Sequence, residues 1–312
     1  MPVGPGDDAA VLQFGTGRVV ATTDTMSEGQ DFQLGWWQDP RRAAHSVGVK
    51  AAAQNLSDIS AMGADPVALL VSLTLPAETS LGWARDLMAG VAQACTAPGT
   101  DQCLIAGGDL GLGNLVSVTI TALGSLTGSR ALLRSGAQAG DVVAVCGPLG
   151  RAAAGLWMLE GQQLHAEDPT GAALACREAQ QRPAPDLTAG KRALDAGATA
   201  GMDVSDGLLR DAQRLATASG VGLRLDEDAL AEDVSVLEGL SAEHARDWVL
   251  CGGEDYALLC TFSPSRSSGA SRTEELPRGF RRIGQVLDGA PEISIGDTVF
   301  PPTVAAGWDS LR

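Results

Sequence analysis

The spacing of apolar and polar residues predicts strands and helices that alternate along the chain. Strands are predicted at residues 18–24, 67–75, 103–106, 115–126, 142–146 and 257–262. Helices are predicted at residues 81–95, 151–160 and 206–219. Ser205 is expected to cap the last of these helices, and the proline-containing stretch 177–186 to form a solvated connection. Because strands and helices alternate, we expect an α/β fold.

One long helix carries polar residues on a face that is otherwise apolar. It is predicted to begin at Pro40, with Asp39 as its N-cap, and to end before Gly63. Asn55 and Asp58 lie at helical spacing with alanines and a methionine, so they interrupt a stripe that we expect to be buried. A buried carboxylate is costly unless it is hydrogen-bonded, paired or bound to a cation. Asp58 is therefore either a cap for a neighbouring loop or part of a cation site.

The apolar pattern pauses around residues 127–129, which predicts a boundary between two α/β domains, residues 1–127 and 128–312. At 312 residues the chain is long enough for two separate cores. Its net charge of −16 argues against a nucleic-acid partner. The same charge means that a phosphate substrate would need divalent cations between its oxygens and the protein's carboxylates.

The cysteines, histidines and apolar runs give no sign of an exported or membrane protein. The six cysteines form no C-x-x-C pair, and the three histidines lie outside the acidic motifs, so neither a zinc site nor histidine catalysis is supported. The chain opens without a signal-peptide pattern, and its longest apolar run, near residues 67–75, is too short to span a membrane. We therefore expect a soluble cytoplasmic protein that contacts neither membranes nor nucleic acid.

Acidic residues recur after glycines, at strand ends or on the helix stripe in six separate segments. They are Asp7 with Asp8, Asp24, Asp58, Asp109, Asp203 with Asp206, and Glu254. Each fits ordinary turn chemistry, but together they supply the oxygen ligands that Mg²⁺ prefers when it binds nucleotide phosphates. The chain has no G-x-x-x-x-G-K-[ST] loop, so phosphate chemistry would depend on metals and on Arg134. The turn at residues 147–150, between a strand and a helix, could also cradle a phosphate.

Seven motifs occur in a fixed order along the chain. They are Gly6-Asp7-Asp8-Ala9-Ala10-Val11, Thr22-Thr23-Asp24, Asn55-Leu56-Ser57-Asp58-Ile59-Ser60-Ala61-Met62-Gly63-Ala64, Gly107-Gly108-Asp109, Arg134-Ser135-Gly136, Asp203-Val204-Ser205-Asp206-Gly207 and Gly253-Glu254-Asp255-Tyr256. As an ordered set they resemble the thiamine-monophosphate kinase family, within the superfamily of aminoimidazole-ribotide synthetase-like ATP-binding proteins. The resemblance extends over essentially the whole chain and implies the two-domain α/β fold of that superfamily, with mixed (α+β) sheets.

The resemblance also implies a reaction and a set of site residues. ATP would donate its γ-phosphoryl group to thiamine monophosphate, and Mg²⁺ would be held by Asp8, Thr22, Thr23, Asp24, Asp58, Asp109, Asp203 and Asp206. ATP would contact Gly108, Asp109, Arg134 and Ser205, while thiamine would meet Asp31, Glu254 and Trp308. No side chain is assigned as a catalytic acid or base. The protein would be a homodimer, with the N-terminal domain carrying the dimer contact and part of the ATP and Mg²⁺ site, and the C-terminal domain completing the nucleotide and substrate site.

Two features depart from the family's pattern. Asp31 stands where the family usually has a substrate-contacting histidine, seven residues after Asp24. The family's segment ahead of the Gly-x-Gly-Asp-Asp motif, which includes a short helix, is missing, and from this we expect a late start or a trimmed chain.

Other members of the superfamily and a non-enzyme remain as alternatives. Selenophosphate synthetases need a reactive cysteine near the N-terminus, whereas the first cysteine here is Cys95. Hydrogenase-maturation relatives end in a reactive cysteine, whereas this chain ends in Arg312. A synthetase of purine biosynthesis is harder to exclude. A non-catalytic acidic protein that holds nucleotides and divalent cations would bind ATP without releasing ADP when thiamine monophosphate is added.

Overall fold

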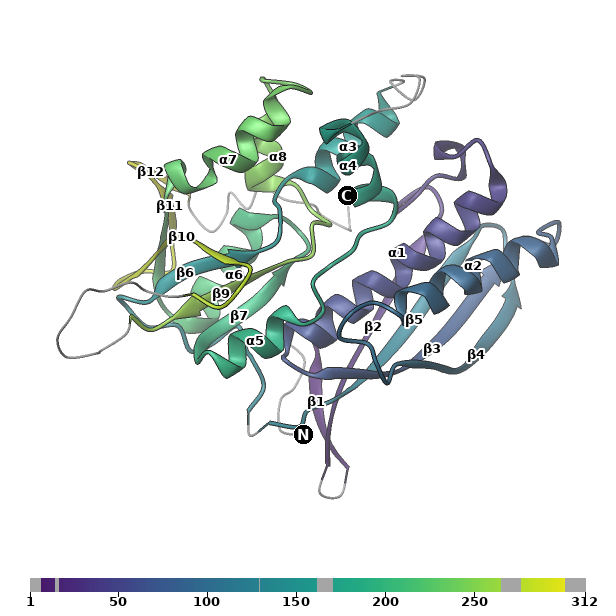
Figure 1. Ribbon diagram of the computed structural model, residues 1–312, viewed down its shortest axis with the longest axis horizontal. Coiled ribbons are helices and arrows are strands. Elements are labelled where there is room, and N and C mark those ends of the chain that lie inside the picture. Colours follow the sequence, from purple (N-terminus) through teal and green to yellow (C-terminus); the bar gives the residue numbers. More distant parts are fainter. Residues whose placement is uncertain (1–6, 15–16, 129, 162–170, 265–275, 301–312) are drawn as a thin grey trace.

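Two lobes, each built on one β-sheet, make up the molecule (Figure 1). The computed structural model describes residues 7–14, 17–128, 130–161, 171–264 and 276–300. The first sheet has the strand order β1-β2-β5-β3-β4 and the second the order β12-β11-β8-β10-β6-β9-β7. Both sheets contain parallel and antiparallel pairs, and helices pack on them, so the predicted α/β fold with mixed sheets is confirmed.

The first lobe is a sheet with two long helices on one face (Figure 1). Its strands are β1 (Ala10–Phe14), β2 (Gly17–Ser27), β3 (Asp65–Leu75), β4 (Leu104–Leu112) and β5 (Ser117–Ser125). Its helices are α1 (Pro40–Ala61) and α2 (Leu81–Ala94), with a 3-10 turn, η1 (Leu34–Trp36), before α1. Alternate residues of β5 are fully buried under the helices, because successive side chains of a strand point to opposite faces.

Helix α1 has the ends that its sequence predicts. The Asp39 side chain accepts a hydrogen bond of 2.9 Å from the backbone N–H of Arg41, and Pro40 occupies the first turn. The chain leaves the helix through Gly63, which adopts a φ of +72°. Most of α1 is buried because it lies between the first sheet, α2 and the second lobe. It therefore presents polar side chains to interior surfaces that the two lobes share.

The other face of the first sheet is not covered by any helix of the described chain. Hydroxyl pairs cross it between β2 and β5, with Thr23 Oγ1 3.0 Å from Thr121 Oγ1 and Thr25 Oγ1 2.8 Å from Thr119 Oγ1. Leu70 of β3 lies in the same row as Thr121 and is 40% exposed. Edge strand β4 is exposed over most of its length. The lobe thus leaves one broad, partly apolar sheet face open.

The second lobe contains the larger sheet and six helices among its described residues. Its strands are β6 (Val142–Cys146), β7 (Ala198–Val204), β8 (Gly222–Leu225), β9 (Ala257–Phe262), β10 (Phe280–Leu287), β11 (Ile293–Ile295) and β12 (Thr298–Phe300). Its helices are α3 (Arg151–Glu160), α4 (Ala172–Gln181), α5 (Ala189–Asp195), α6 (Leu208–Ser219), α7 (Glu227–Glu238) and α8 (Ala245–Cys251). The division of the chain near residue 127 stays a prediction; β5 ends at Ser125 and β6 begins at Val142.

One predicted connection is helical instead. Residues 177–181 form the last turns of α4, and Gln180 and Gln181 are buried, so the expectation of a solvated connection over 177–186 is wrong for this half. The prolines begin only at Pro183, after the helix has ended. The prediction relied on charge and proline content, which do not show packing between distant segments. The end of α4 is buried because it packs against the first lobe, where Gln181 Nε2 donates to Trp36 O at 3.3 Å.

The lobes are joined through the C-terminal half of α1. Ala61 packs into a shared apolar cluster with residues of α5, β7 and β9. Ser60 Oγ donates a 2.8 Å hydrogen bond to the carbonyl of Leu187, in the segment before α5. The acids at this end of α1 therefore face the second lobe. Within the described ranges, no helix is both long and apolar enough to cross a membrane.

Candidate functional site

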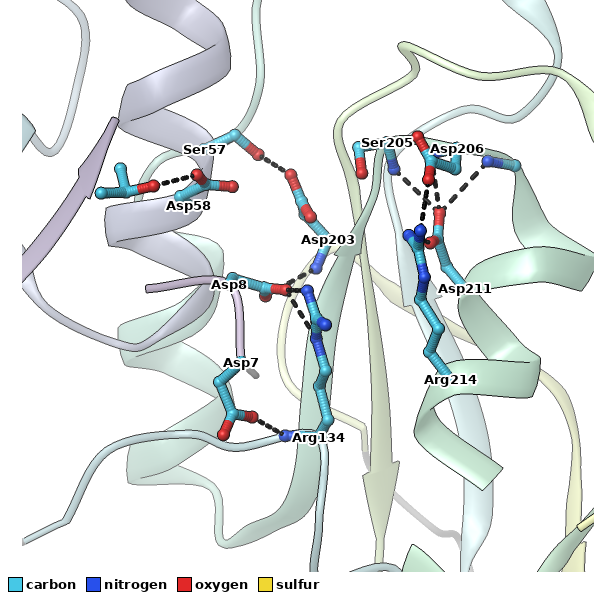
Figure 2. A network of polar contacts seen from close by, with 12 residues as sticks. Asp7, Asp8, Ser57, Asp58, Arg134, Asp203, Ser205, Asp206, Asp211 and Arg214 are labelled. Atoms are coloured by element: carbon cyan, nitrogen blue, oxygen red, sulfur yellow. Dashed lines mark hydrogen bonds and ion pairs between the residues drawn. The ribbon is translucent and has the colours of Figure 1, made fainter. Parts of the chain in front are cut away.

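A group of carboxylates from both lobes meets at the end of α1 (Figure 2). Asp58 comes from α1, Asp203 from the end of β7, and Asp8 from the segment before β1. The Ser57 hydroxyl donates to Asp203 Oδ2 at 2.8 Å, and the Thr22 hydroxyl donates to Asp58 Oδ2 at 2.7 Å. The backbone N–H of Asp203 donates to Asp8 Oδ2 at 3.2 Å. Three acids that are far apart in the sequence thus become neighbours across the lobe boundary.

Burial and mutual repulsion disfavour the ionised forms of these carboxylates. Burial raises the pKa of Asp58 well above its ordinary value, and the charges of Asp203, Asp24 and Asp8 raise it further. Burial likewise raises the pKa of Asp203, with Asp8 as the next cause. Each shift means that the ionised form lacks adequate compensation inside the protein. The group therefore favours a bound cation or a proton.

Asp24 extends the group along β2. Its backbone N–H donates to Asn55 Oδ1 at 3.2 Å, so the two polar interruptions of the α1 stripe, Asn55 and Asp58, both contact β2. These contacts fall in the middle of the strand, because β2 continues past the predicted end at Asp24 to Ser27. Asp24 Oδ2 is buried and has no hydrogen-bond partner in the described part of the chain. Burial raises the pKa of Asp24. An unpartnered buried carboxylate oxygen is the kind of atom that a cation or ligand donor completes.

Arg134 neutralises one of the acids. Its Nη2 lies 2.6 Å and its Nε 3.0 Å from Asp8 Oδ1, and its backbone N–H donates to Asp7 Oδ1 at 2.6 Å (Figure 2). Burial still raises the pKa of Asp8, although the Arg134 charge opposes that shift. Arg134 therefore fixes the acidic turn against the second lobe.

The loop of Ser205 and Asp206 is held by a residue that the sequence did not point out. Asp211, fully buried in α6, accepts from the backbone N–H groups of Ser205, Asp206 and Gly207 at 3.0, 2.9 and 3.1 Å. Arg214 bridges Asp211 Oδ1 at 2.7 Å and Asp206 Oδ2 at 2.6 Å (Figure 2). Burial raises the pKa of Asp211 to about 6.

The expected N-cap at Ser205 is therefore wrong. Helix α6 begins at Leu208 after Gly207, and no side chain caps it in the usual way. Asp211 instead reaches back from the first turn and accepts from backbone N–H groups that precede the helix. The available signal was an aspartate on the apolar face of a strongly amphipathic helix, but its partners could be identified only in three dimensions.

Asp31 and Glu254 are brought together by Lys50, a second residue that the sequence did not single out. Lys50 Nζ lies 2.7 Å from Glu254 Oε1 and donates to the carbonyl oxygen of Asp31 at 2.9 Å. The Asp31 carboxylate accepts a 2.7 Å hydrogen bond from the backbone N–H of Ser27, which closes its own turn. These two predicted thiamine contacts thus lie side by side at the lobe boundary.

Three predicted residues are not brought to the carboxylates. Gly108 lies in the row of Asp24, but on β4, about 14 Å away at the usual strand spacing. Asp109 is exposed on the same edge strand. The Thr23 hydroxyl lies on the open face and donates to Ile120 O at 3.2 Å. Among described residues no three acidic, histidine or cysteine side chains converge closely enough to hold a metal ion by themselves, and Trp308 lies outside them.

The predicted phosphate cradle at residues 147–150 is already filled by the protein. The Asp255 carboxylate accepts from the backbone N–H groups of Gly150 at 2.5 Å and Ala152 at 3.1 Å, at the start of α3. Asp233 accepts from the N–H of Leu149 at 3.3 Å. Because a helix N-terminus offers few free N–H groups, these carboxylates replace the expected phosphate, and this prediction is wrong.

The two domains are those of an AIR synthase related protein. Residues 6–126 match the N-terminal domain of that family and residues 138–292 its C-terminal domain. Within it, the chain belongs to the thiamine-monophosphate kinase family. It is 40% identical to the thiamine-monophosphate kinase of Mycobacterium tuberculosis strain H37Rv, over 99% of this chain and 86% of the relative.

Solved structures agree with this assignment. AaThiL complexed with AMPPCP and TMP superposes with a TM-score of 0.81 at 30% identity, covering 97% of this chain and 90% of that one. Thiamine-monophosphate kinase from Stenotrophomonas maltophilia gives a TM-score of 0.75 at 32% identity, covering 94% and 90%.

Proposed function

We propose that this protein is an ATP-dependent kinase that converts thiamine monophosphate to thiamine diphosphate. The observation that carries the proposal is the interlobe group of Asp8, Asp58 and Asp203, in a chain 40% identical to a thiamine-monophosphate kinase over nearly its whole length. The reaction is direct transfer of the γ-phosphoryl group of ATP to the substrate's phosphate. That acceptor oxygen is already anionic at neutral pH, so the chain needs no general base.

The oxygen atoms of the carboxylate group at the lobe boundary fit Mg²⁺. All the donors are hard oxygens, Asp24 Oδ2 lacks a partner among the described residues, and the pKa values of Asp58 and Asp203 are raised by burial and by neighbouring acids. The residues proposed to hold the ions are Asp8, Thr22, Asp24, Asp58, Asp203 and Asp206. Thr23 and Asp109, which lie away from this group, stay predictions from the family resemblance. When bound, Mg²⁺ neutralises and orients phosphate oxygens.

The chain's own contribution is positioning. Ser57 and Thr22 fix the carboxylates of Asp203 and Asp58 by direct hydrogen bonds, and Asp211 fixes the backbone of Ser205 and Asp206. Preset groups of this kind need little rearrangement as charge moves between phosphates. Gly108, Asp109, Arg134 and Ser205 are proposed to contact ATP, and Asp31, Glu254 and Trp308 to contact the thiamine substrate.

A coupled assay for ADP tests this function against its alternatives. ADP release from ATP that requires thiamine monophosphate supports the kinase. ATP binding without such release would indicate a non-catalytic nucleotide-binding protein. ADP release only with a purine-biosynthesis substrate would indicate a synthetase, which the relatives do not favour.

A substitution of Trp308 tests its proposed contact with the thiamine substrate. A cationic thiazolium ring favours an aromatic face. We therefore expect Trp308→Ala to raise the KM for thiamine monophosphate by about tenfold and to leave the KM for ATP nearly unchanged. Steady-state kinetics with each substrate varied in turn measures both constants. Equal changes in the two, or no change, would contradict a thiamine contact and favour a role in anchoring the C-terminal tail.

The protein is further proposed to be a cytoplasmic homodimer. The open face of the first sheet carries exposed apolar residues, among them Val67 and Leu70, beside the threonine pairs. A second copy would bury this face. All six cysteines are free, as in a reducing compartment.

The open face gives a direct test of the dimer. Leu70→Arg places a charge in the middle of that face. At micromolar concentration we therefore expect the unchanged protein to be a dimer and the Leu70→Arg variant to be a monomer. Sedimentation velocity measures the two masses. Glu78→Arg, a charge change outside both sheets, is the control and should leave the dimer intact. A monomeric unchanged protein, or a Leu70→Arg dimer, would contradict the proposed interface.

A further inference from the structure

The Glu254 carboxylate is held by a buried lysine from the other lobe. Lys50 lies in α1 and its side chain is 1% exposed. Its Nζ is 2.7 Å from Glu254 Oε1 and also donates to the Asp31 carbonyl at 2.9 Å. Removing an ammonium group from water is costly unless it is paired and hydrogen-bonded. The placement of Lys50 thus depends on Glu254 being ionised and in this position.

The second Glu254 oxygen is held from within its own lobe. Gln180 of α4 is 1% exposed, and its Nε2 donates to Glu254 Oε2 at 2.7 Å. The orientation of the amide follows from chemistry, because an ionised carboxylate accepts hydrogen bonds only. Gln180 Oε1 then points elsewhere and has no partner among the described residues. Both carboxylate oxygens of Glu254 therefore contact a donor from a buried side chain.

The backbone beneath Glu254 is equally constrained. Glu254 has a φ of +65° and Tyr256 a φ of +49°, a region that residues with side chains rarely adopt. The N–H of Glu254 donates to Ser205 O at 2.7 Å, and that of Tyr256 donates to Val204 O at 2.9 Å. Strained conformations persist where the surroundings fix them, as they do at functional sites. The segment is thereby tied to the loop of Ser205 and Asp206.

We propose that Lys50 and Gln180 form a clamp across the lobe boundary that positions the Glu254 carboxylate for the thiamine substrate. This inference rests on the proposed function, in which Glu254 contacts that substrate. Lys50 and Gln180 act through Glu254, so they are positioning residues. Because Lys50 also holds the Asp31 carbonyl, the clamp sets the spacing between the two proposed thiamine contacts.

Substitution of Lys50 by a neutral side chain of similar length tests the clamp. Lys50→Met removes the charge while filling most of the volume, so we expect a KM for thiamine monophosphate about tenfold higher, with the KM for ATP changed less than about twofold. The double variant Lys50→Met/Glu254→Gln should lose less than the sum of the two single effects, because Lys50 acts chiefly through that carboxylate. Lys191→Met is the matched control at the chain's other lysine, which is 52% exposed, and should change neither constant.

Three kinetic outcomes would overturn the clamp. They are an unchanged KM for thiamine monophosphate in Lys50→Met, equal rises in both KM values, and additive effects in the double variant. A role in folding alone would lower the thermal stability without this division between substrates, so the melting temperature is measured for each variant.

Chemical labelling tests the clamp without any activity. Acetylation of the two lysines, followed by peptide mass spectrometry, should modify Lys191 readily and spare Lys50 in the unchanged protein. Glu254→Gln and Gln180→Ala should each increase Lys50 labelling, and unchanged protection in both would overturn the clamp. If the unchanged protein releases no ADP with thiamine monophosphate, the proposed function fails, and the labelling result still decides whether Lys50 depends on Glu254 and Gln180.

Discussion

Asp58→Asn is expected to lower the turnover of thiamine monophosphate by about a hundredfold or more. The substitution removes one negative charge from the group formed by Asp8, Asp24 and Asp203, which is proposed to hold Mg²⁺ against phosphate oxygens. It keeps the shape of the side chain, and the amide oxygen can still accept from Thr22. Steady-state kinetics at saturating ATP and Mg²⁺ measures the loss, which should appear mainly in kcat.

The same variant should fold at least as well as the unchanged protein. Burial and neighbouring acids raise the pKa of Asp58, which means that its ionised form costs folding free energy at neutral pH. Asn carries no such cost, so the melting temperature is expected to stay the same or rise. Asp65→Asn, at an exposed acid paired with Lys191, is the matched control and should keep full activity. Full activity of Asp58→Asn, or of the unchanged protein in excess EDTA, would contradict the metal assignment.

Gly90→Ala is expected to lower the free energy of unfolding by about 3 kcal/mol. Helices α1 and α2 cross in contact at two glycines: a Cβ at Gly90 would lie 2.0 Å from His45 O, and one at Gly48 would lie 2.0 Å from Leu87 O. These neighbours are backbone atoms, so the helices would have to separate. Alanine has the higher helix propensity, by about 1 kcal/mol, and this only partly offsets the clash. Urea unfolding followed by circular dichroism measures the difference.

A glycine in the same helix provides the control for that measurement. A Cβ at Gly82 would come no closer than 3.7 Å, to Ser80 Oγ. Gly82→Ala should therefore be neutral or stabilising by up to about 1 kcal/mol, because it gains propensity without a clash. Equal stability of the two variants would show that α1 and α2 are not packed this closely.

Local elements followed well from the sequence. Asp39, Pro40 and Gly63 marked the ends of α1 correctly, because caps and helix breakers act on the backbone within a few residues. The Asn55 and Asp58 positions on its buried stripe were informative for the same reason: helical spacing fixes which side chains share a face. The recurrence of acids after glycines was informative only in part: Asp7 and Glu254 contact residues across the lobe boundary, whereas Asp109 lies on the exposed edge strand β4.

Partners distant in the chain could not be read from these patterns. Whether a helix N-terminus is free depends on what packs against it, and at α3 the occupant is Asp255. Likewise, no side chain caps α6, and Asp211 instead accepts from the N–H of Gly207 just ahead of the helix. Strand order also decides distances. The recurrence of acids and the family resemblance grouped Asp109 with Asp24, whereas β5 and β3 lie between their strands.

By itself, the sequence determined the alternation of helices and strands, the buried face of α1 and the set of acids available for phosphate chemistry. These properties depend on local backbone preference, side-chain periodicity and residue type. Only the tertiary structure decided that Asp8, Asp58 and Asp203 meet, that Lys50 pairs with Glu254, and that Thr23 faces away. The physical reason is that hydrogen bonds and ion pairs act over a few ångströms, and folding alone brings such segments within that range.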